Sequence, residues 1–254
     1  MKTALVLSAG GMFGAYQAGA WSVLANEFQP DLVVGASIGA VNGWAIAGGC
    51  TPQALIDSWL NLGDLARHRW RVPRRASHGL LDSQPVEDLI QRTHSEYSPR
   101  LPYALVATDT LRLRPVLFEG PDLTWQHVAA SAAIPGLFSQ HRIERRWYCD
   151  GGLLCPLPLW AAAALGADRI VAIDVLPAPP HRAVRAIALG LRRMARFTEH
   201  VPEHIEVTRI TAPAGMGSIQ DALCWKRANA ERWIEQGMRD AAAMRTGAFA
   251  HACR

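Results

Sequence analysis

Short apolar runs alternate with helix-length segments along most of this sequence, and that order leaves few folds open. The first run, Thr3–Leu7, and the second, Leu32–Gly35, each lead through a glycine-containing junction into a helical segment. Strands that alternate with helices in this way build a mostly parallel sheet with helices on its faces. We therefore predict an α/β fold, a single doubly wound three-layer sandwich with a mostly parallel central sheet.

Hydrophobic periodicity and capping residues place the predicted elements. Gly14–Phe28 carries apolar residues on one helical stripe, and Thr51-Pro52 supplies a cap and an N-terminal proline for a helix that extends toward Leu62. Residues 66–79 lack apolar periodicity and are predicted to form a loop. The other predicted helices cover residues 38–48, 84–92, 124–132, 160–165, 184–197 and 221–244, and the other strands cover residues 103–108, 114–119, 169–175 and 205–210.

The chain is long enough for a sizeable core, with 254 residues of which 50% are hydrophobic. No linker rich in proline or glycine divides it, and no internal repeat is present. We predict one domain over residues 1–254, with the core motifs within residues 2–175. Residues 176–254 are expected to add helical and strand elements that complete this domain.

Charge and cysteine content argue against several classes of function. The net charge of +4 is modest and no aromatic-basic repeat accompanies it, so we expect no nucleic-acid partner. The cysteines are odd in number and form no C-x-x-C pair, which argues against a zinc site and a disulfide framework. Buried free thiols fit a reducing compartment. The five are Cys50, Cys149, Cys155, Cys224 and Cys253.

The N-terminal segment resembles a signal peptide only superficially. Its apolar run, Ala4–Leu7, is too short for the hydrophobic region of such a peptide. A transmembrane helix needs about 18 consecutive apolar residues, and the sequence has no such stretch. We therefore expect a cytoplasmic protein whose membrane contact, where it occurs, is peripheral.

A lone serine stands between two glycines at the end of the second predicted strand, in Gly35-Ala36-Ser37-Ile38-Gly39. This G-x-S-x-G pattern is typical of a nucleophile elbow, a strained strand-to-helix turn that exposes the serine hydroxyl. Glycine and serine are also common in ordinary turns. The motif alone leaves both interpretations open.

The first predicted strand runs into a glycine-rich loop, Ser8–Gly14, before a helix begins. Unpaired amides at a helix N-terminus can hold a phosphate or stabilise an oxyanion. The nucleotide-binding patterns require G-x-G-x-x-G or a Walker lysine, and this loop has neither. The loop therefore favours an oxyanion site.

An acidic residue precedes two glycines in Asp150-Gly151-Gly152. Its carboxylate can act as the general base for a nearby serine if burial raises its pKa. The alternative is an Asx-turn, in which Asp150 accepts a hydrogen bond from its own backbone.

Four segments together resemble the patatin-like phospholipase family, over about Lys2 to Ile173. They are SAGGMFGAYQAG (8–19), GASIGAVNG (35–43), ASAAIPGLF (130–138) and YCDGG (148–152). The resemblance implies a Ser–Asp dyad without a catalytic histidine, with Ser37 as nucleophile and Asp150 as base. It also implies an oxyanion hole formed by the amides of Gly10, Gly11 and Met12.

The implied reaction is the hydrolysis of acyl esters in lipids through an acyl-enzyme, so a lipid or another ester is the expected substrate. We expect neither a cofactor nor a metal ion. An α/β-hydrolase with a late histidine base is the less favoured alternative, because the elbow follows only the second strand.

Two residues depart from the family pattern. Ala9 stands where the family loop usually begins with glycine, and Phe13 stands where it usually carries a basic residue. Alanine requires a negative φ at its position, and the missing cation either weakens oxyanion stabilisation or changes only how the loop packs. A catalytically silent domain that binds lipid or protein is therefore the second hypothesis.

Other polar residues suggest sites less strongly. The histidines are scattered, and Pro202 argues against a metal pair of His200 and His204. Asp109 ends a predicted strand, and we interpret it as structural rather than as part of the site.

Two further segments admit a membrane interpretation. Residues 67–75 place five arginines around Trp70, either as a solvated loop or as a basic surface for anionic lipids. The segment His181–His200 has an apolar face and an arginine-rich face, and packing on the sheet explains it better than a membrane anchor.

Overall fold

The computed structural model describes residues 1–63, 70–75, 77–177, 182–195, 197–213 and 216–248, with only the backbone over 182–188 and 245–248. The strands are β1 (Thr3–Leu7), β2 (Leu32–Ala36), β3 (Tyr103–Asp109), β4 (Arg114–Glu119), β5 (His141–Ile143), β6 (Arg146–Cys149), β7 (Arg169–Asp174) and β8 (Glu206–Thr211). The helices are α1 (Gly14–Leu24), α2 (Ile38–Ala47), α3 (Pro52–Leu60), α4 (Gln84–Glu96), α5 (Trp125–Ala132), α6 (Leu159–Ala164), α7 (Arg182–Ala195), α8 (Ile219–Leu223) and α9 (Arg227–Ala248), with 3₁₀ turns η1 (Gly11–Phe13) and η3 (Gly151–Leu153).

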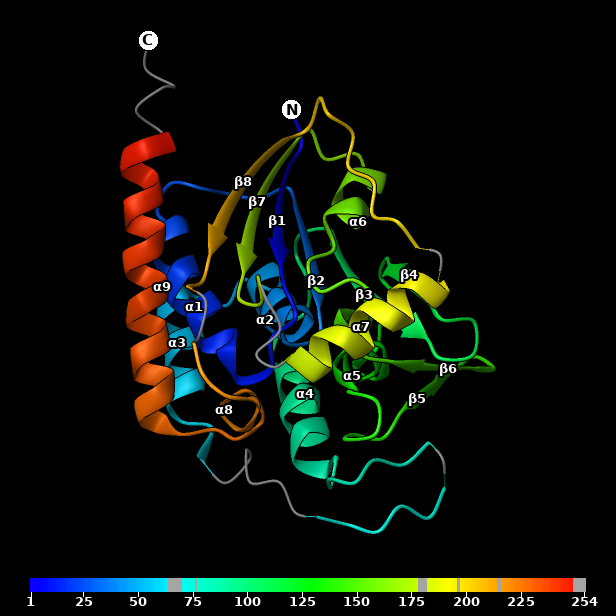
Figure 1. The fold of residues 1–254 in the computed structure, drawn as a ribbon. Coiled ribbons are helices and arrows are strands. Elements are labelled where there is room, and N and C mark those ends of the chain that lie inside the picture. Colours follow the sequence, from blue (N-terminus) through cyan, green and yellow to red (C-terminus); the bar gives the residue numbers. More distant parts are fainter. Residues whose placement is uncertain (64–69, 76, 178–181, 196, 214–215, 249–254) are drawn as a thin grey trace.

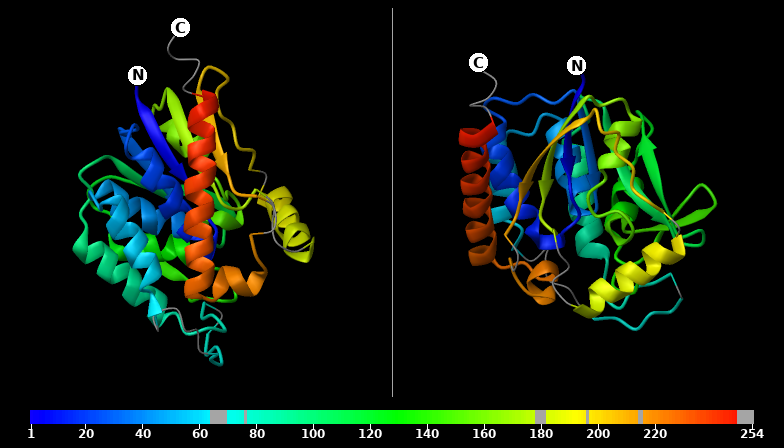
Figure 2. Two further views of the ribbon diagram at one scale, coloured as in Figure 1. Left: turned by 90° about the vertical axis from the view of Figure 1, so that its left-hand side faces the viewer. Right: turned by 45° about the horizontal axis from the view of Figure 1, so that its top comes forward.

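These strands form one sheet in the order β5-β6-β3-β2-β1-β7-β8, with β4 also paired to β3. The five strands β3, β2, β1, β7 and β8 run parallel, so their carboxyl ends meet at one edge. The pairings of β4, β5 and β6 are antiparallel. Helices cover both faces (Figures 1 and 2). The predicted α/β sandwich with a mostly parallel sheet is confirmed.

Alternate residues of the central strands enter two separate cores. Leu5 and Leu7 of β1 pack in the larger core with α1, α2, α3 and α9, whereas Ala4 and Val6 pack in a smaller core with α6. Because both faces are covered, the central strands are continuous apolar runs without the alternation of a half-exposed strand. None of the described helices combines the length and apolar composition that a membrane span needs.

The pair α1–α9 packs backbone against backbone. A Cβ at Gly19 would lie 2.0 Å from the carbonyl oxygen of Ile234, and one at Gly237 would lie 2.2 Å from that of Tyr16. The Tyr16 hydroxyl also donates to Asp240 Oδ2 at 2.8 Å. α9 therefore sits as close to α1 as two helices can, and glycine on both sides permits it (Figure 2).

We expect Gly19→Ala to lower the free energy of unfolding by about 2–4 kcal/mol, because the added methyl group has to push the two helices apart. Urea denaturation followed by circular dichroism measures this loss. The matched control is Gly190→Ala in α7, where no atom lies within 4 Å of the new Cβ. Alanine favours a helix over glycine, so the control should lose no stability; equal losses in both variants would contradict the close-packing argument.

The prediction of one helix over residues 221–244 was wrong, because the chain forms two helices there. α8 begins earlier, where Ser218 and Asp221 form a capping box, and Cys224 then adopts an extended conformation. In the connection that follows, Trp225 Nε1 donates to the carbonyl oxygen of Trp59 at 2.9 Å. This contact with the end of α3 turns the chain before α9 begins.

The antiparallel hairpin of β5 and β6 was not predicted. Its strands are three and four residues long, too short for alternation to stand out. Its turn places Glu144 at a φ of 48°, and glutamate gives no turn signal in a sequence. The other elements lie where they were predicted, with ends that differ by a few residues.

Candidate active site

Ser37 occupies a strained turn between β2 and α2. Its φ of 54° and ψ of −125° are unusual for a residue with a side chain and cost on the order of 1–3 kcal/mol. The turn is tight on both sides: a Cβ at Gly35 would lie 2.3 Å from Gly39 O, and one at Gly39 would lie 2.3 Å from Leu7 O. Both glycines of G-x-S-x-G are therefore required by backbone packing.

A buried serine holds this turn from the side of β3. The amide of Ser37 donates to Ser131 Oγ at 2.8 Å, and that hydroxyl donates to the carbonyl oxygen of Val106 at 2.7 Å. Ser131 is fully buried in α5. The sequence reasoning did not single out this residue, although it lies in the ASAAIPGLF segment that supported the family resemblance.

Asp150 follows β6 and lies against the elbow. The hydroxyl of Ser37 donates to Asp150 Oδ2 at 2.5 Å, and the Gly152 amide donates to Oδ1 at 2.7 Å. Thr108 Oγ1 donates to the carbonyl oxygen of Asp150 at 2.9 Å. A Cβ at Gly151 would lie 2.0 Å from the carbonyl oxygen of Val106, so the DGG glycine lets this segment approach β3.

Burial raises the pKa of Asp150 to about 6, and the hydrogen bonds from Ser37 and Gly152 oppose that rise. A carboxylate with such a pKa is a stronger base than an exposed one and is still ionised at neutral pH. The pair of side chains thus has the contact and the basicity that transfer of the serine proton requires.

The raised pKa also makes the ionised carboxylate a cost to the fold. The cost is absent below pH 4, where Asp150 is protonated in both states, and it grows as the pH rises through about 6. We expect Asp150→Asn to raise the free energy of unfolding by up to about 3 kcal/mol at pH 8, and by little at pH 4. Urea denaturation at both pH values measures the difference.

Asp31 provides the control of opposite sign. Hydrogen bonds from the amide and hydroxyl of Thr3 lower its pKa, so its ionised form stabilises the fold above pH 4. Asp31→Asn should therefore lose stability as the pH rises, where Asp150→Asn gains it. A gain for Asp150→Asn that is the same at pH 4 and pH 8 would contradict a buried, ionised carboxylate.

The glycine loop, residues 8–14, lies between the end of β1 and α1. Gly11 has a φ of 57°, and Gly11 and Met12 line a cavity together with Ser37. The amides of Gly10 and Gly11 donate no hydrogen bond to another described residue. Free amides beside a nucleophile are the donors that an oxyanion hole needs.

A short helix from the far end of the chain covers this loop. A Cβ at Gly11 would lie 2.2 Å from the carbonyl oxygen of Ala222 in α8, and Ala222 and Leu223 line the cavity beside Ser37. The 3₁₀ turn η1 and α8 therefore meet directly.

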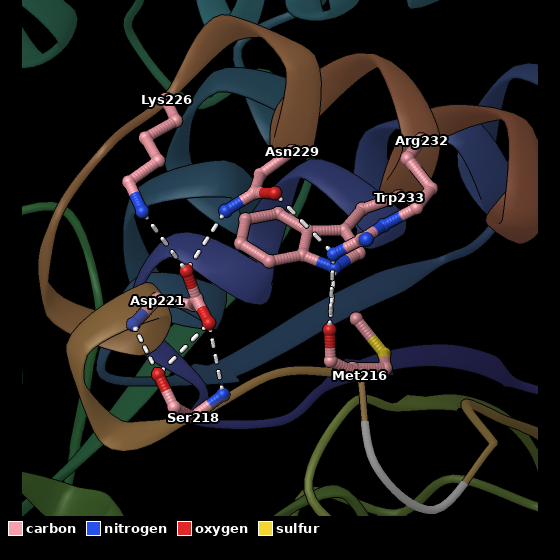
Figure 3. A network of polar contacts seen from close by, with 7 residues as sticks. All are labelled: Met216, Ser218, Asp221, Lys226, Asn229, Arg232 and Trp233. Carbon is pink, nitrogen blue, oxygen red and sulfur yellow. Dashed lines mark hydrogen bonds and ion pairs between the residues drawn. The ribbon is translucent and has the colours of Figure 1, made fainter.

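A polar network fixes α8 in this position (Figure 3). Asp221 Oδ2 accepts from the amide and hydroxyl of Ser218 at 3.0 and 2.8 Å. Asp221 Oδ1 accepts from Asn229 Nδ2 of α9 at 3.0 Å and lies 3.5 Å from Lys226 Nζ. The Ser218 contacts are the main reason that the pKa of Asp221 falls to about 2. The network ties α8 to α9.

The two departures from the family pattern are accommodated by packing. Phe13 is buried and meets Trp233 of α9 edge to face, with ring centroids 4.9 Å apart. Trp233 Nε1 in turn donates to the carbonyl oxygen of Met216 at 3.0 Å (Figure 3). Ala9 is not among the described residues with positive φ, so its side chain is tolerated, and it lies where a Cβ at Gly152 would be 2.3 Å from its own Cβ.

The cavity at Ser37 has a volume of about 60 Å³ and a mostly apolar lining from α2, α4, α5 and α8. No histidine is among the described residues that line it. Within the described part of the chain, no three His, Cys, Asp or Glu side chains gather as a metal site would need.

The other residues considered from the sequence lie elsewhere. Asp109 Oδ1 accepts from the amides of Leu111 and Arg112, so it holds the turn before β4. His127 caps α5 through Thr124, and His141 lies 3.6 Å from a carboxylate oxygen of Glu87. The cysteines Cys50, Cys149, Cys155 and Cys224 are free thiols, whereas Cys253 lies outside the described residues.

The arginine-rich segment is described only in part, since Arg67 and Arg69 lie outside the described residues. Trp70 is 76% exposed and Val72 is 87% exposed. Arg74 and Arg75 are exposed beside them. In the segment His181–His200, the side chains of residues 182–188 also lie outside the description, and its predicted packing on the sheet stays a prediction.

Comparison with known proteins gives the family. The model of the family "Patatin-like phospholipase" matches residues 5–163. Uncharacterized NTE family proteins of Mycobacterium tuberculosis and Mycobacterium bovis are 32% identical over 208 residues, which is 78% of this chain. The chain spans 56% of the length of these relatives.

Among solved structures, the fold is similar to that of VipD from Legionella pneumophila. The TM-score is 0.53 with 14% sequence identity, over 96% of this chain and 66% of the other. This likeness concerns the fold alone, whereas the family match covers the strands, the glycine loop, the elbow and the Asp150 turn. The chain therefore belongs to the patatin-like phospholipase family.

Proposed function

We propose that this protein is a serine hydrolase that cleaves acyl esters of lipids through an acyl-enzyme on a Ser37–Asp150 dyad. The observation that carries the proposal is the hydrogen bond from Ser37 Oγ to Asp150 Oδ2, at 2.5 Å, beside an apolar cavity. Membership of a phospholipase family supports a lipid ester as the substrate.

In the acylation step, Ser37 Oγ attacks the ester carbonyl carbon while its proton moves to Asp150 Oδ2. The negative charge that develops on the carbonyl oxygen is stabilised by the amides of Gly10, Gly11 and Met12. The tetrahedral intermediate then expels the alcohol, whose oxygen takes the proton from Asp150. The acyl group is left on Ser37.

In the deacylation step, water replaces the alcohol. Asp150 takes a proton from this water, and the water oxygen adds to the acyl carbon. The bond to Ser37 Oγ breaks, the serine recovers its proton from Asp150, and the fatty acid leaves. A single carboxylate thus serves as base and acid in both halves.

The packing of the two unusual loop residues favours an active enzyme over a catalytically silent binding domain. Phe13 lies in the core against Trp233, and Ala9 has an allowed φ. Neither substitution displaces Ser37, Asp150 or the loop amides. The oxyanion then depends on backbone donors alone, which act without a nearby cation.

We expect Ser37→Ala and Asp150→Asn each to lower hydrolysis of p-nitrophenyl butyrate by about a thousandfold or more, because the nucleophile or its base is lost. A fluorophosphonate probe should label the wild type and spare Ser37→Ala. In the wild type, kcat/KM should rise with pH through about 6 and then level off, as Asp150 ionises.

Single alanine variants at His127, His141, His200 and His204 are the controls, and each should keep most of the activity. A histidine variant as inactive as Asp150→Asn would replace the dyad with a triad. A wild type that hydrolyses no ester and binds no probe would favour the silent domain.

We further propose that the enzyme contacts anionic membranes at its surface. Exposed apolar side chains gather on three segments at the end of the molecule where β1, β7 and β8 end: the 70–80 segment, α7 and α8 (Figure 1). They are Trp70, Val72, Leu80, Leu189, Met194 and Ile219. Arg74 and Arg75 are exposed in the first segment, and arginine beside exposed apolar groups suits an anionic lipid surface.

We expect the triple variant Arg71→Gln, Arg74→Gln, Arg75→Gln to bind vesicles of anionic lipid more weakly, with a smaller salt dependence. Each arginine contributes on the order of 1 kcal/mol at such a surface. Co-sedimentation measures the binding, and hydrolysis of p-nitrophenyl butyrate should hardly change.

The control removes the same charge from other exposed positions, with Arg100→Gln, Arg209→Gln and Arg239→Gln. This control should bind vesicles nearly as the wild type does. Equal binding by both triple variants would reduce the 70–80 segment to an ordinary solvated loop.

A further inference from the structure

A second, larger cavity lies behind the catalytic one. Its volume is about 450 Å³, and residues of α2, α3 and α4 line it. Its inner wall is apolar and includes Ala45 and Leu55, whereas Asp57, Asn61 and Glu96 lie exposed along its rim. This cavity is more than seven times as large as the one at Ser37, so it can hold what the catalytic cavity cannot.

The two cavities share one wall. Ile38, Val41, Trp59, Leu62 and Leu89 line both of them. All five side chains are apolar or aromatic, and they come from α2, from α3 with the residues after it, and from α4. They form a hydrophobic neck between Ser37 and the larger cavity.

The direction of this path follows from the helix that begins at the nucleophile. Ile38, Val41 and Ala45 of α2 succeed one another at helical spacing on one face, and all three line the larger cavity. At 1.5 Å per residue, Ala45 lies roughly 12 Å along the axis from Ser37. A long acyl chain spans this distance, and an acetyl or butyryl group does not.

The aromatic side of the neck is held in place by buried hydrogen bonds. Trp59 Nε1 donates to Asn42 Oδ1 at 3.1 Å, and Asn42 Nδ2 donates to Gln17 Oε1 at 2.8 Å. Asn42 Nδ2 also donates to the carbonyl oxygen of Gly14 at 3.0 Å, at the end of the glycine loop. The wall of the neck is therefore fixed relative to the loop that faces the reacting carbonyl.

We infer that the fatty-acyl chain of the substrate runs from Ser37 through this neck, along α2, into the larger cavity, and that Leu89 sets the width of the passage. The inference rests on the proposed function and deepens it by assigning the acyl side of the ester to the space between α2, α3 and α4. The chain meets apolar groups throughout the neck, so each methylene removed from water adds binding energy. The enzyme should therefore prefer long-chain acyl esters.

The test is a comparison of kcat/KM for p-nitrophenyl butyrate and p-nitrophenyl dodecanoate, both below their aggregation limits. Leu89 is only half-buried in α4, so it tolerates a change of size. We expect Leu89→Trp to lower kcat/KM for the dodecanoate by about tenfold or more and to leave the butyrate within about twofold. Leu89→Ala should keep or raise activity toward the dodecanoate.

Two controls make the result specific to the passage. Gln91→Trp places the same bulk on α4 at a residue that lines neither cavity, and it should leave both esters unchanged. Ala45→Leu narrows the path further from Ser37 and should lower activity toward the dodecanoate without affecting the butyrate. A Leu89→Trp variant with an unchanged ratio of the two activities would overturn the inference while the proposed hydrolysis stood.

A binding measurement separates the inference from the hydrolysis. The Ser37→Ala protein should bind a fluorescent long-chain fatty acid, and Leu89→Trp in that background should weaken the binding by about tenfold, whereas Gln91→Trp should not. Equal binding by all three proteins would overturn the acyl path. Failure of the wild type to hydrolyse either ester would instead overturn the proposed function.

Discussion

The close approach of backbone around Ser37 is the constraint on which the site depends. Gly39 leaves no room for a side chain because the carbonyl oxygen of Leu7 lies against it, so the elbow is pressed onto the end of the neighbouring strand. The same contact sets the distance between the glycine loop, which continues from Leu7, and the nucleophile. Strain at Ser37 persists because packed glycines and the hydroxyl of Ser131 leave its backbone no alternative.

This arrangement also explains why an aspartate is sufficient as the proposed base. Its carboxylate is buried, and only two hydrogen bonds, from Ser37 and Gly152, reach its oxygens among the described contacts. Burial without a nearby cation raises the pKa. A lysine or arginine in contact would have lowered the pKa and weakened the base, so the apolar character of the site is part of its chemistry.

Sequence reasoning reached the sheet, its parallel core and the segments that meet at Ser37, because each depends on local patterns. Strands buried on both faces are continuous apolar runs, and glycines mark tight turns. Ser131 was missed because a serine inside a helix gives no sign of what it contacts in the fold. The break between α8 and α9 was missed for a similar reason: it depends on Trp225 meeting α3, a contact between residues more than 160 positions apart. The neck between the cavities arises from three helices at once, and no single segment indicates it.

α8 gives the family match a different meaning for anyone who wishes to shorten the chain. The match ends at residue 163, and every recognisable motif lies before that point. Yet Ala222 and Leu223 supply one wall of the cavity at Ser37, and Ala222 backs Gly11. A fragment cut after the last motif would keep the nucleophile and the acid while opening the site to water on one side. The motifs mark the chemistry, but the compartment in which it takes place is completed by the last quarter of the chain.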